Sequence, residues 1–119
     1  MTPTNGQYSS LDEFWPFYVS QHLNPVNRKL HFLGTTGGLL FAAGAACLRQ
    51  PILALAALGT AYGAAWIGHF AFERNRPATF TYPLLSFRAD FRMYWLTLTN
   101  QMDAEILLRT RELKDLRKG

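Results

Sequence analysis

The feature that most constrains this chain is a stretch of 43 residues, 30–72, that contains a single formal charge, Arg49. This charge separates two apolar runs, 30–48 and 52–72, which are 19 and 21 residues long. A helix needs about 20 such residues to cross the hydrocarbon core of a bilayer. Pro51 follows the charge closely and predicts a tight turn between the runs. The stretch therefore predicts a transmembrane helical hairpin.

The overall composition hides this pattern because the charged ends dilute the apolar middle. The mean hydropathy of −0.04, taken alone, would suit a soluble domain. A soluble hairpin buried in a core is the alternative, but two adjacent runs of spanning length are uncommon in a soluble chain of 119 residues. With 49% hydrophobic residues the chain is neither disordered nor collagen-like, and its one cysteine excludes an internal disulfide.

We predict an all-α fold, in which the hairpin is flanked by interfacial amphipathic helices and the whole chain forms one membrane domain. The last helical segment could be one helix or two. The expected elements are an interfacial helix at 9–23, a first span at 26–48, a second span at 52–73 and an amphipathic segment at 84–116.

The segment before the hairpin carries the signals of a helix start. Ser10 and Glu13 match a capping box. Pro16 is tolerable only if it lies in the first turn of this helix. Four aromatic residues between positions 14 and 18 predict an interfacial belt. Asn24, which precedes a proline, is expected to end this helix and cap the next one.

Small residues predict where the two spans touch. Gly34 and Gly38 are four residues apart in the first span, as are Gly59 and Gly63 in the second. Such spacing lets helix backbones approach closely. We expect packing within the hairpin, with a homo-oligomer as the alternative. Cys47 is read as a packing residue near the turn.

The basic residues predict the orientation. Only Arg49 lies on the turn side, and the other 11 lie outside the hairpin. The positive-inside rule then places both termini in the cytoplasm, for a protein of the bacterial inner membrane or the endoplasmic reticulum. Because these residues are spread along the membrane margin, nucleic-acid binding is the weakest interpretation.

Two of the three histidines lie at matched positions in the hairpin. His31 is 19 residues before Gln50, at the centre of the turn, and His69 is 19 residues after it. Both are then about 28 Å from the apex of an antiparallel hairpin. His22 precedes the hairpin on the same side of the membrane, and Glu73 shares a helix face with His69. We therefore expect the three histidines to converge.

Several imidazoles with a carboxylate suit zinc, iron, copper or nickel, and two or three histidines with one carboxylate are typical of non-haem iron oxygenases. No local signature such as HExxH accompanies them, and a lone interfacial histidine is most often a hydrogen-bonded residue. Two other functions remain open from the residues alone. His31 and His69 could be axial ligands of a haem in a membrane redox protein, or the chain could be a non-catalytic membrane scaffold.

Two longer motifs resemble a known family. The first runs from Tyr18 to Thr35 and the second from Trp66 to Phe80, with Tyr82-Pro83 and Asp90 beyond it. They resemble the signatures of the small membrane proteins typified by the fungal 2-hydroxy-palmitate dioxygenase of fatty acid α-oxidation. The resemblance implies an Fe(II)-dependent dioxygenase that shortens a 2-hydroxy fatty acid by one carbon, with O2 consumed and CO2 released. It implies the iron ligands His22, His31 and His69.

Other residues complete the expected site. Glu73 is added on geometry as a catalytic carboxylate. Asp90 is either a partner that supports the ligands or part of a surface ion pair. The fatty acid tail would rest in the lipid bilayer. The residues expected to bind the polar head of the substrate are Arg28, Arg76, Asn27 and Asn75.

Overall fold

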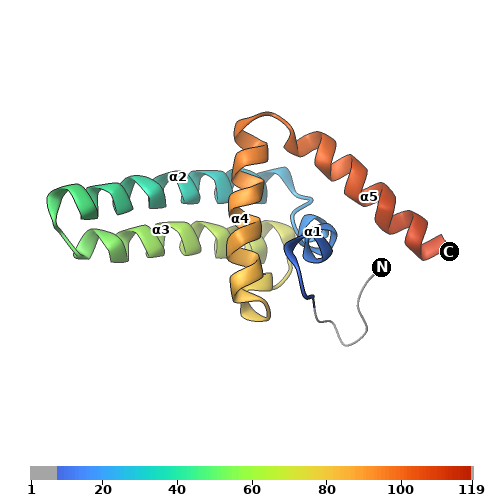
Figure 1. Cartoon of the computed structure of the whole chain (residues 1–119), viewed down its shortest axis with the longest axis horizontal. Coiled ribbons are helices and arrows are strands. Elements are labelled where there is room, and N and C mark those ends of the chain that lie inside the picture. Colours follow the sequence, from blue (N-terminus) through green and yellow to red (C-terminus); the bar gives the residue numbers. More distant parts are fainter. Residues whose placement is uncertain (1–7, 119) are drawn as a thin grey trace. The chain divides into compact units, whose positions relative to one another are not determined.

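The computed structural model describes residues 8–118, and all regular structure in that part of the chain is helical (Figure 1). The elements are α1 (Leu11–Ser20), α2 (Pro25–Leu48), α3 (Ile52–Ile67), the π-helical turn η2 (Gly68–Glu73), the short 3-10 helix η3 (Ala78–Phe80), α4 (Pro83–Leu98) and α5 (Met102–Lys118). The predicted all-α class is confirmed.

The described chain divides into two compact units, and a single membrane domain over 1–119 stays a prediction. The hairpin unit is Asn24–Pro77. The flanking unit combines residues 8–23 with residues 78–118. Residues 1–7 and 119, which the prediction included, lie outside the described residues.

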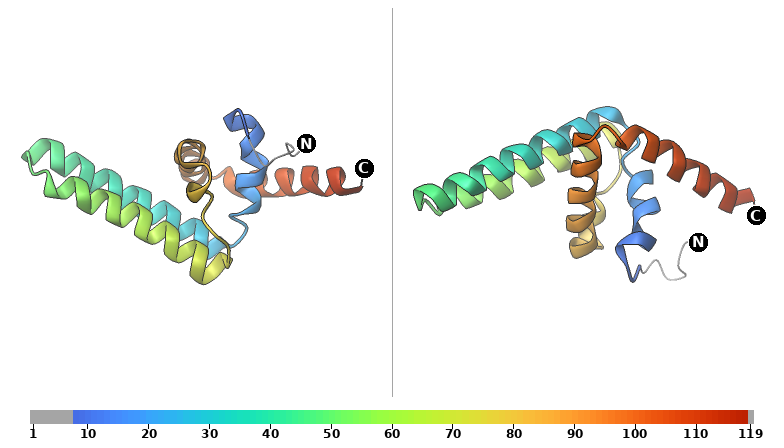
Figure 2. Two further views of the ribbon diagram at one scale, coloured as in Figure 1. Left: turned by 90° about the horizontal axis from the view of Figure 1, so that it is seen from below. Right: turned by 45° about the horizontal axis from the view of Figure 1, so that its top comes forward.

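In the hairpin unit, α2 and α3 run side by side in opposite directions (Figures 1 and 2). Arg49 takes a left-handed conformation, with φ of 54°, and ends α2, while Pro51 caps α3, so the predicted tight turn is confirmed. The two arms, Pro25–Leu48 and Ile52–Glu73, are long and apolar enough to cross a membrane. In the most apolar 18-residue stretch of each arm, only 17% and 11% of the stretch, respectively, is buried in the structure. These values argue against the soluble core hairpin, whose helices would be mostly buried.

Glycines of α2 form the contact between the arms. A Cβ atom at Gly34 would lie 2.7 Å from the Cβ of Ala64, and one at Gly38 would lie 3.2 Å from the backbone oxygen of Ala57. The backbones therefore approach as closely as the glycine spacing predicted.

The prediction that Gly59 and Gly63 belong to the same contact is wrong. A Cβ atom at either position would have no heavy atom within 4 Å, so both lie on a face of α3 that α2 does not cover. Cys47 is exposed, so it is not the packing residue that we expected. Small residues occur on more than one face of these helices, and the spacing alone does not show which face is used.

Large apolar side chains point outward from the hairpin unit, while small and polar residues are buried. This is the reverse of a soluble core and suits a lipid environment. The buried residues of α2 are Asn27, His31, Gly34 and Gly38. Leucine and isoleucine side chains that are more than half exposed are Leu33, Leu40, Leu48, Ile52, Leu55, Leu58 and Ile67.

Asn24 fixes the start of α2, as predicted. Its side-chain oxygen accepts a hydrogen bond from the N–H of Val26 at 2.8 Å. Its own backbone N–H donates to Oε1 of Glu73 at 2.6 Å, and its amide nitrogen donates to the carbonyl of Phe72 at 3.2 Å. These bonds tie the start of α2 to the end of η2 and close the open end of the hairpin.

In the flanking unit, Ser10 caps α1 as predicted, because its hydroxyl accepts from the N–H of Glu13 at 3.2 Å. The requirement that Pro16 lie in the first turn is wrong. Helix α1 begins at Leu11, so Pro16 falls in the second turn. Its ring nitrogen cannot donate to the carbonyl of Asp12, and because Asp12 is exposed, water can satisfy that carbonyl instead.

The aromatic residues of α1 form the core of the flanking unit, so the prediction that they form an interfacial belt is wrong. Phe14, Trp15 and Tyr18 are almost completely buried. They pack with Met93 of α4 and Met102 of α5 in one hydrophobic cluster. Contacts with helices that lie far along the chain decide this burial, and the local sequence does not reveal them.

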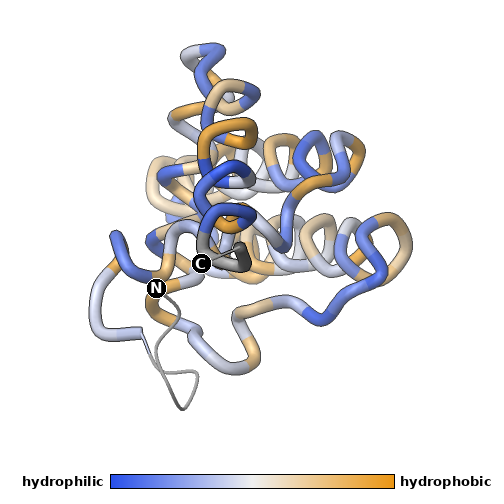
Figure 3. Tube along the Cα trace, turned by 90° about the vertical axis from the view of Figure 1, so that its right-hand side faces the viewer, coloured by the Kyte–Doolittle hydropathy of each residue, from blue (hydrophilic) through white to orange (hydrophobic). Residues whose placement is uncertain are grey.

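The amphipathic segment at 84–116 is two helices. Helix α4 ends at Leu98, Asn100 adopts a left-handed conformation with φ of 64°, and α5 starts at Met102. Helix α5 contains both polar and apolar residues, as the mixed colours of the tube in Figure 3 indicate, and Arg109 forms ion pairs with Glu105 and Glu112.

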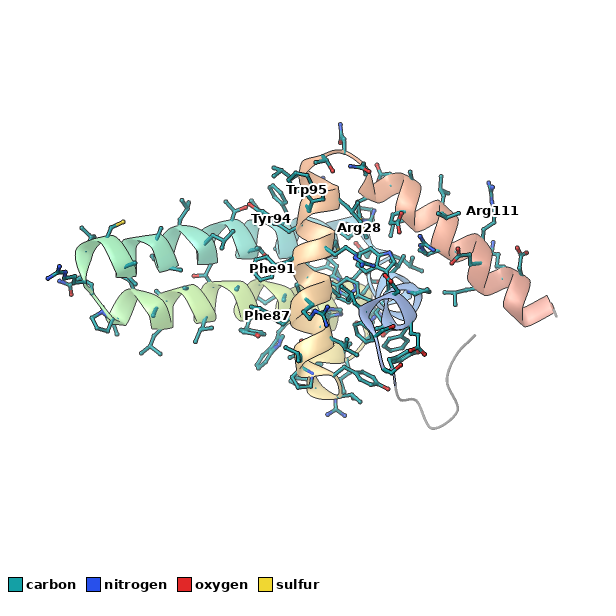
Figure 4. The ribbon with its side chains drawn as sticks, viewed as in Figure 1. Arg28, Phe87, Phe91, Tyr94, Trp95 and Arg111 are labelled. Atoms are coloured by element: carbon teal, nitrogen blue, oxygen red, sulfur yellow. The ribbon has the colours of Figure 1, made fainter. Side chains whose placement is uncertain are left out.

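The face that α4 buries consists of Ser86, Ala89 and Met93. Its larger apolar side chains are exposed instead. The rings of Phe87 and Phe91 are in edge-to-face contact, with centroids 5.1 Å apart. Trp95 lies on the same helix (Figure 4). The exposed set is Leu84, Phe87, Phe91, Trp95 and Leu98. These residues belong to the amphipathic segment that was predicted at 84–116, and their side chains are exposed.

Candidate metal centre

The two histidines of the hairpin unit face each other. The ring centroids of His31, on α2, and His69, in η2, are 5.0 Å apart, and the ring planes are at 82°. Both residues are buried. The equal depth predicted from their equal distance to the turn is confirmed, because the antiparallel arms bring the two rings into contact.

His69 lies in the π-helical turn, where α3 widens before the hairpin unit ends. Single π-helical turns occur frequently at functional sites. Gly68 allows this turn to approach α2, since a Cβ atom at this position would lie 2.0 Å from Oδ1 of Asn27. Arg74 then takes a left-handed conformation with φ of 59° and ends the turn. The sequence carries no signal that we recognised for the widened turn.

Each histidine has its Nδ1 atom hydrogen-bonded to an oxygen of its own unit. Nδ1 of His22 lies 2.6 Å from the carbonyl oxygen of Tyr18. The corresponding distance is 3.0 Å from His31 to the carbonyl of Asn27, and 2.6 Å from His69 to Oδ1 of Asn75. These oxygens can only accept, so Nδ1 carries the proton and Nε2 carries the lone pair. Metal-binding histidines are typically fixed in this way.

His22, His31 and His69 are a group of buried histidines that could hold a metal ion. In the neutral form with the proton on Nδ1, each imidazole offers one nitrogen donor, Nε2. His22 belongs to the flanking unit but stands only two residues before Asn24, the cap of α2. Its Cα therefore lies within about 7.6 Å of the Cα of Asn24, because consecutive Cα atoms are about 3.8 Å apart.

Glu73 is hydrogen-bonded to the start of α2. Its Oε1 atom accepts from the N–H of Asn24 at 2.6 Å and from the amide nitrogen of Asn27 at 3.2 Å. The carboxylate thus lies at the N-terminus of α2, where the helix dipole favours negative charge. Among the described residues, Glu73 is not part of the histidine group. Its catalytic role stays a prediction.

The two asparagines expected to bind substrate hold the histidines in place. Asn27 is completely buried, and its carbonyl and amide contact His31 and Glu73. Asn75 orients His69. Arg28 is partly buried and Arg76 is exposed. A substrate contact stays a prediction for all four residues.

Tyr18, which is buried, and Asp90, which is partly buried, form a hydrogen-bonded pair in the flanking unit. The Tyr18 hydroxyl donates to Oδ1 of Asp90 at 2.5 Å. Burial raises the pKa of Asp90 to about 7, while the Tyr18 hydrogen bond acts in the opposite direction. Burial, and then the nearby carboxylate, raise the pKa of Tyr18 well above its usual value. Of the two roles predicted for Asp90, the partner role has the observed contact.

The Tyr18 ring also stacks on His22. The ring centroids are 4.0 Å apart and the planes are at 22°. Sequence reasoning did not include Tyr18 in the site. The available signal was its position four residues before His22, which places both side chains on one side of the chain as it leaves α1.

The fold and the site define a class: an all-helical protein with two candidate membrane-spanning helices and three buried histidines that could hold a metal ion. The family described as 2-hydroxy-palmitic acid dioxygenase Mpo1-like matches residues 8–102. The chain therefore belongs to the Mpo1-like family, as the resemblance of its motifs implied. The matched range includes all three histidines, Glu73 and Asp90. No curated protein and no solved structure matches this chain.

Proposed function

We propose that this chain is an Fe(II)-dependent membrane dioxygenase that shortens long-chain 2-hydroxy fatty acids by one carbon. One observation carries the proposal of a metal site: each of the three buried histidines has Nδ1 bonded to an oxygen, so that Nε2 presents its lone pair. The name of the family supports the substrate class and the dioxygenase reaction.

The donor set fits iron. Imidazole nitrogen suits iron, and three protein ligands leave coordination positions for substrate and O2. When bound, Fe(II) would supply the redox chemistry with O2 and a Lewis acid for the carboxylate and 2-hydroxyl groups of the substrate. The four electrons that O2 accepts are those released when the shorter acid, CO2 and water are formed. No external reductant is then needed.

The residues of the chain would bind and orient an amphipathic substrate. The apolar exterior of the hairpin unit supports a position of the fatty acid tail in lipid. Arg28 and Arg76, at the end of the hairpin that carries His31 and His69, are proposed to hold the substrate carboxylate. Asn27 and Asn75 are proposed to keep the two imidazoles oriented while substrate binds. Glu73 is proposed to exchange a proton with the substrate.

The membrane arrangement follows from the same features. We propose that α2 and the α3–η2 arm cross the bilayer with both chain termini in the cytoplasm. The exposed apolar stripe of α4 would lie in the membrane interface, where aromatic side chains are favoured.

The geometry argues against a haem held by His31 and His69. Axial ligands lie on opposite faces of a porphyrin, which must fit between them. The two rings are in edge contact with centroids 5.0 Å apart, so no such plane fits in this arrangement. A non-catalytic scaffold has no need for three buried histidines in fixed tautomers, and such groups are expensive in or near a membrane.

Turnover of 2-hydroxypalmitic acid by purified protein tests the proposal. The protein is reconstituted in lipid nanodiscs with Fe(II), and O2 uptake and products are followed by electrode and mass spectrometry. We expect O2 consumption, CO2 release and a product one carbon shorter, all lost in His31→Ala. Leu33→Ala is the control, because this neighbouring side chain points away from the site and is 63% exposed. Undiminished turnover by His31→Ala would contradict the proposal.

A further inference from the structure

Tyr18 connects two residues that lie far apart in the sequence. Its hydroxyl donates to Asp90 on α4, and its ring stacks on His22. Its carbonyl oxygen is also the acceptor for Nδ1 of His22. All of these contacts lie within the flanking unit. The imidazole of His22 is thus restrained twice by one residue: once at Nδ1 and once across the plane of the ring.

We propose that Asp90 is a positioning residue for the metal centre: by holding the Tyr18 hydroxyl, it fixes the ring on which His22 stacks and so directs Nε2 of His22 toward the metal. The inference rests on the proposed function. It assigns Asp90 and Tyr18 a role in ligand geometry without placing either residue on the metal or the substrate.

The hydrogen bond between Nδ1 of His22 and the Tyr18 carbonyl still allows the imidazole to rotate about the line of that hydrogen bond. The Tyr18 ring, which is stacked on the imidazole, limits this rotation. The tyrosine ring is itself fixed at its far end by Asp90, at 2.5 Å. Partners that orient a ligand in this way typically change metal affinity by about 10- to 100-fold when they are removed.

A neighbouring pair provides a matched control. Trp15 is also on α1 and also buried, and its Nε1–H donates to Oε1 of Glu105 on α5 at 2.7 Å. Loss of either carboxylate removes one hydrogen bond between α1 and a later helix. Only Asp90 bonds to the residue that contacts His22.

The experiment measures Co(II) and Fe(II) affinity, and the visible spectrum of the Co(II) form, for the full chain in detergent. We expect Asp90→Ala to weaken metal binding by about 10-fold or more and to change the Co(II) spectrum in the direction seen for His22→Ala. Asp90→Asn should restore both, because its amide oxygen can accept from Tyr18. Glu105→Ala should keep wild-type affinity and spectrum, even if its melting temperature falls.

Tyr18→Phe is the second variant should Asp90→Ala fail to fold, since it keeps the ring and removes only the hydroxyl; the same loss of affinity is expected. Wild-type affinity and spectrum in Asp90→Ala or Tyr18→Phe, with His31→Ala defective, would overturn this inference alone. If the wild type binds no metal, or His31→Ala binds it equally well, the proposed function fails as well, and the two failures are thereby distinguished.

Discussion

The hairpin unit and the flanking unit bury opposite kinds of residue. In the hairpin unit the buried side chains include Asn27, His31 and His69, and the large aliphatic ones are exposed. In the flanking unit the aromatic side chains of α1 are buried against α4 and α5, and charged pairs such as Arg109–Glu105 lie at the surface. The exterior of the hairpin unit suits lipid, whereas the flanking unit has a core of the kind found in water-soluble proteins.

Because of this difference, the two units hold their histidines in different ways. Lipid offers no hydrogen bonds, so buried polar groups in the hairpin unit must be satisfied internally. Glu73, Asn27 and Asn75 provide such bonds, and Asn27 and Asn75 at the same time orient the two histidines. In the flanking unit, a rigid aromatic core holds the third histidine. The following predictions test this contrast, beginning with the largest effect.

Glu73 and Glu105 compare a partly buried carboxylate contact in the hairpin unit with one in the flanking unit. In Glu73→Gln the amide oxygen can still accept from Asn24 and Asn27, so the fold should persist. Loss of the proposed proton transfer should lower kcat about 100-fold or more. Glu105→Gln should keep wild-type kcat. The measurement is steady-state O2 uptake together with thermal unfolding.

Glu73→Ala separates the structural role from the catalytic one. It leaves two donors at the start of α2 without their acceptor, which should destabilise the protein by about 1–3 kcal/mol. Equal melting temperatures for Glu73→Ala and Glu73→Gln would show that the hydrogen bonds of this carboxylate do not stabilise the hairpin.

Leu40 and Leu107 compare the outer surfaces of the two units. They are 70% and 66% exposed, on α2 and α5 respectively. Leu40→Lys should disfavour membrane insertion by about 3 kcal/mol, because it places a charge in the hydrocarbon core. Leu107→Lys should change stability by less than about 0.5 kcal/mol. A glycosylation-reporter insertion assay measures the first and thermal unfolding the second. Equal tolerance of both changes would remove the distinction between the surfaces.

Gly68 and Gly63 compare a packed position with an open one within the hairpin unit. A methyl group at Gly68 would lie 2.0 Å from Oδ1 of Asn27, whereas Gly63 has no neighbour within 4 Å. Gly68→Ala should therefore destabilise the protein by about 1–3 kcal/mol and weaken metal binding, because Asn27 must shift. Gly63→Ala should be neutral or slightly stabilising. Melting temperature and metal titration of both variants check this, and similar behaviour of the two would contradict the packing.

Asp90 gives the flanking unit a pH dependence with a defined sign. Burial raises the pKa of Asp90 from its usual value of 3.8 to about 7 in the folded protein, so the folded state binds its proton more tightly. The resulting stabilisation is lost as pH rises from about 4 to 7, by up to about 1.4 kcal/mol per pH unit. Asp90→Asn should thus become more stable relative to wild type over that range. Parallel stability curves for the two proteins would contradict the assignment.

Counting along helices predicted the hairpin, its turn and the contact of His31 with His69, because each depends only on length and on the rise per residue. The starts of α1 and α2 were also predictable, since Ser10 and Asn24 act within two or three residues of themselves.

What the sequence did not reveal depends on distant partners. Tyr18 is buried because α4 and α5 cover it, and its acceptor Asp90 is 72 residues away. Small residues lie on several faces of α3, and the sequence does not show which of these faces packs against α2. Gly59 lies on a face that α2 does not cover. An amphipathic pattern also does not say whether its apolar side meets protein or lipid, as the outward-facing stripe of α4 shows.

The central claim is that buried histidines of this chain hold iron through Nε2. The most direct test is the iron content of purified, Fe(II)-reconstituted protein, measured by inductively coupled plasma mass spectrometry, for wild type, His69→Ala and the outward-facing control Ile67→Ala. We predict about one iron per chain in wild type and Ile67→Ala, and almost none in His69→Ala. Wild-type protein without iron, or His69→Ala with a full complement, would contradict the claim.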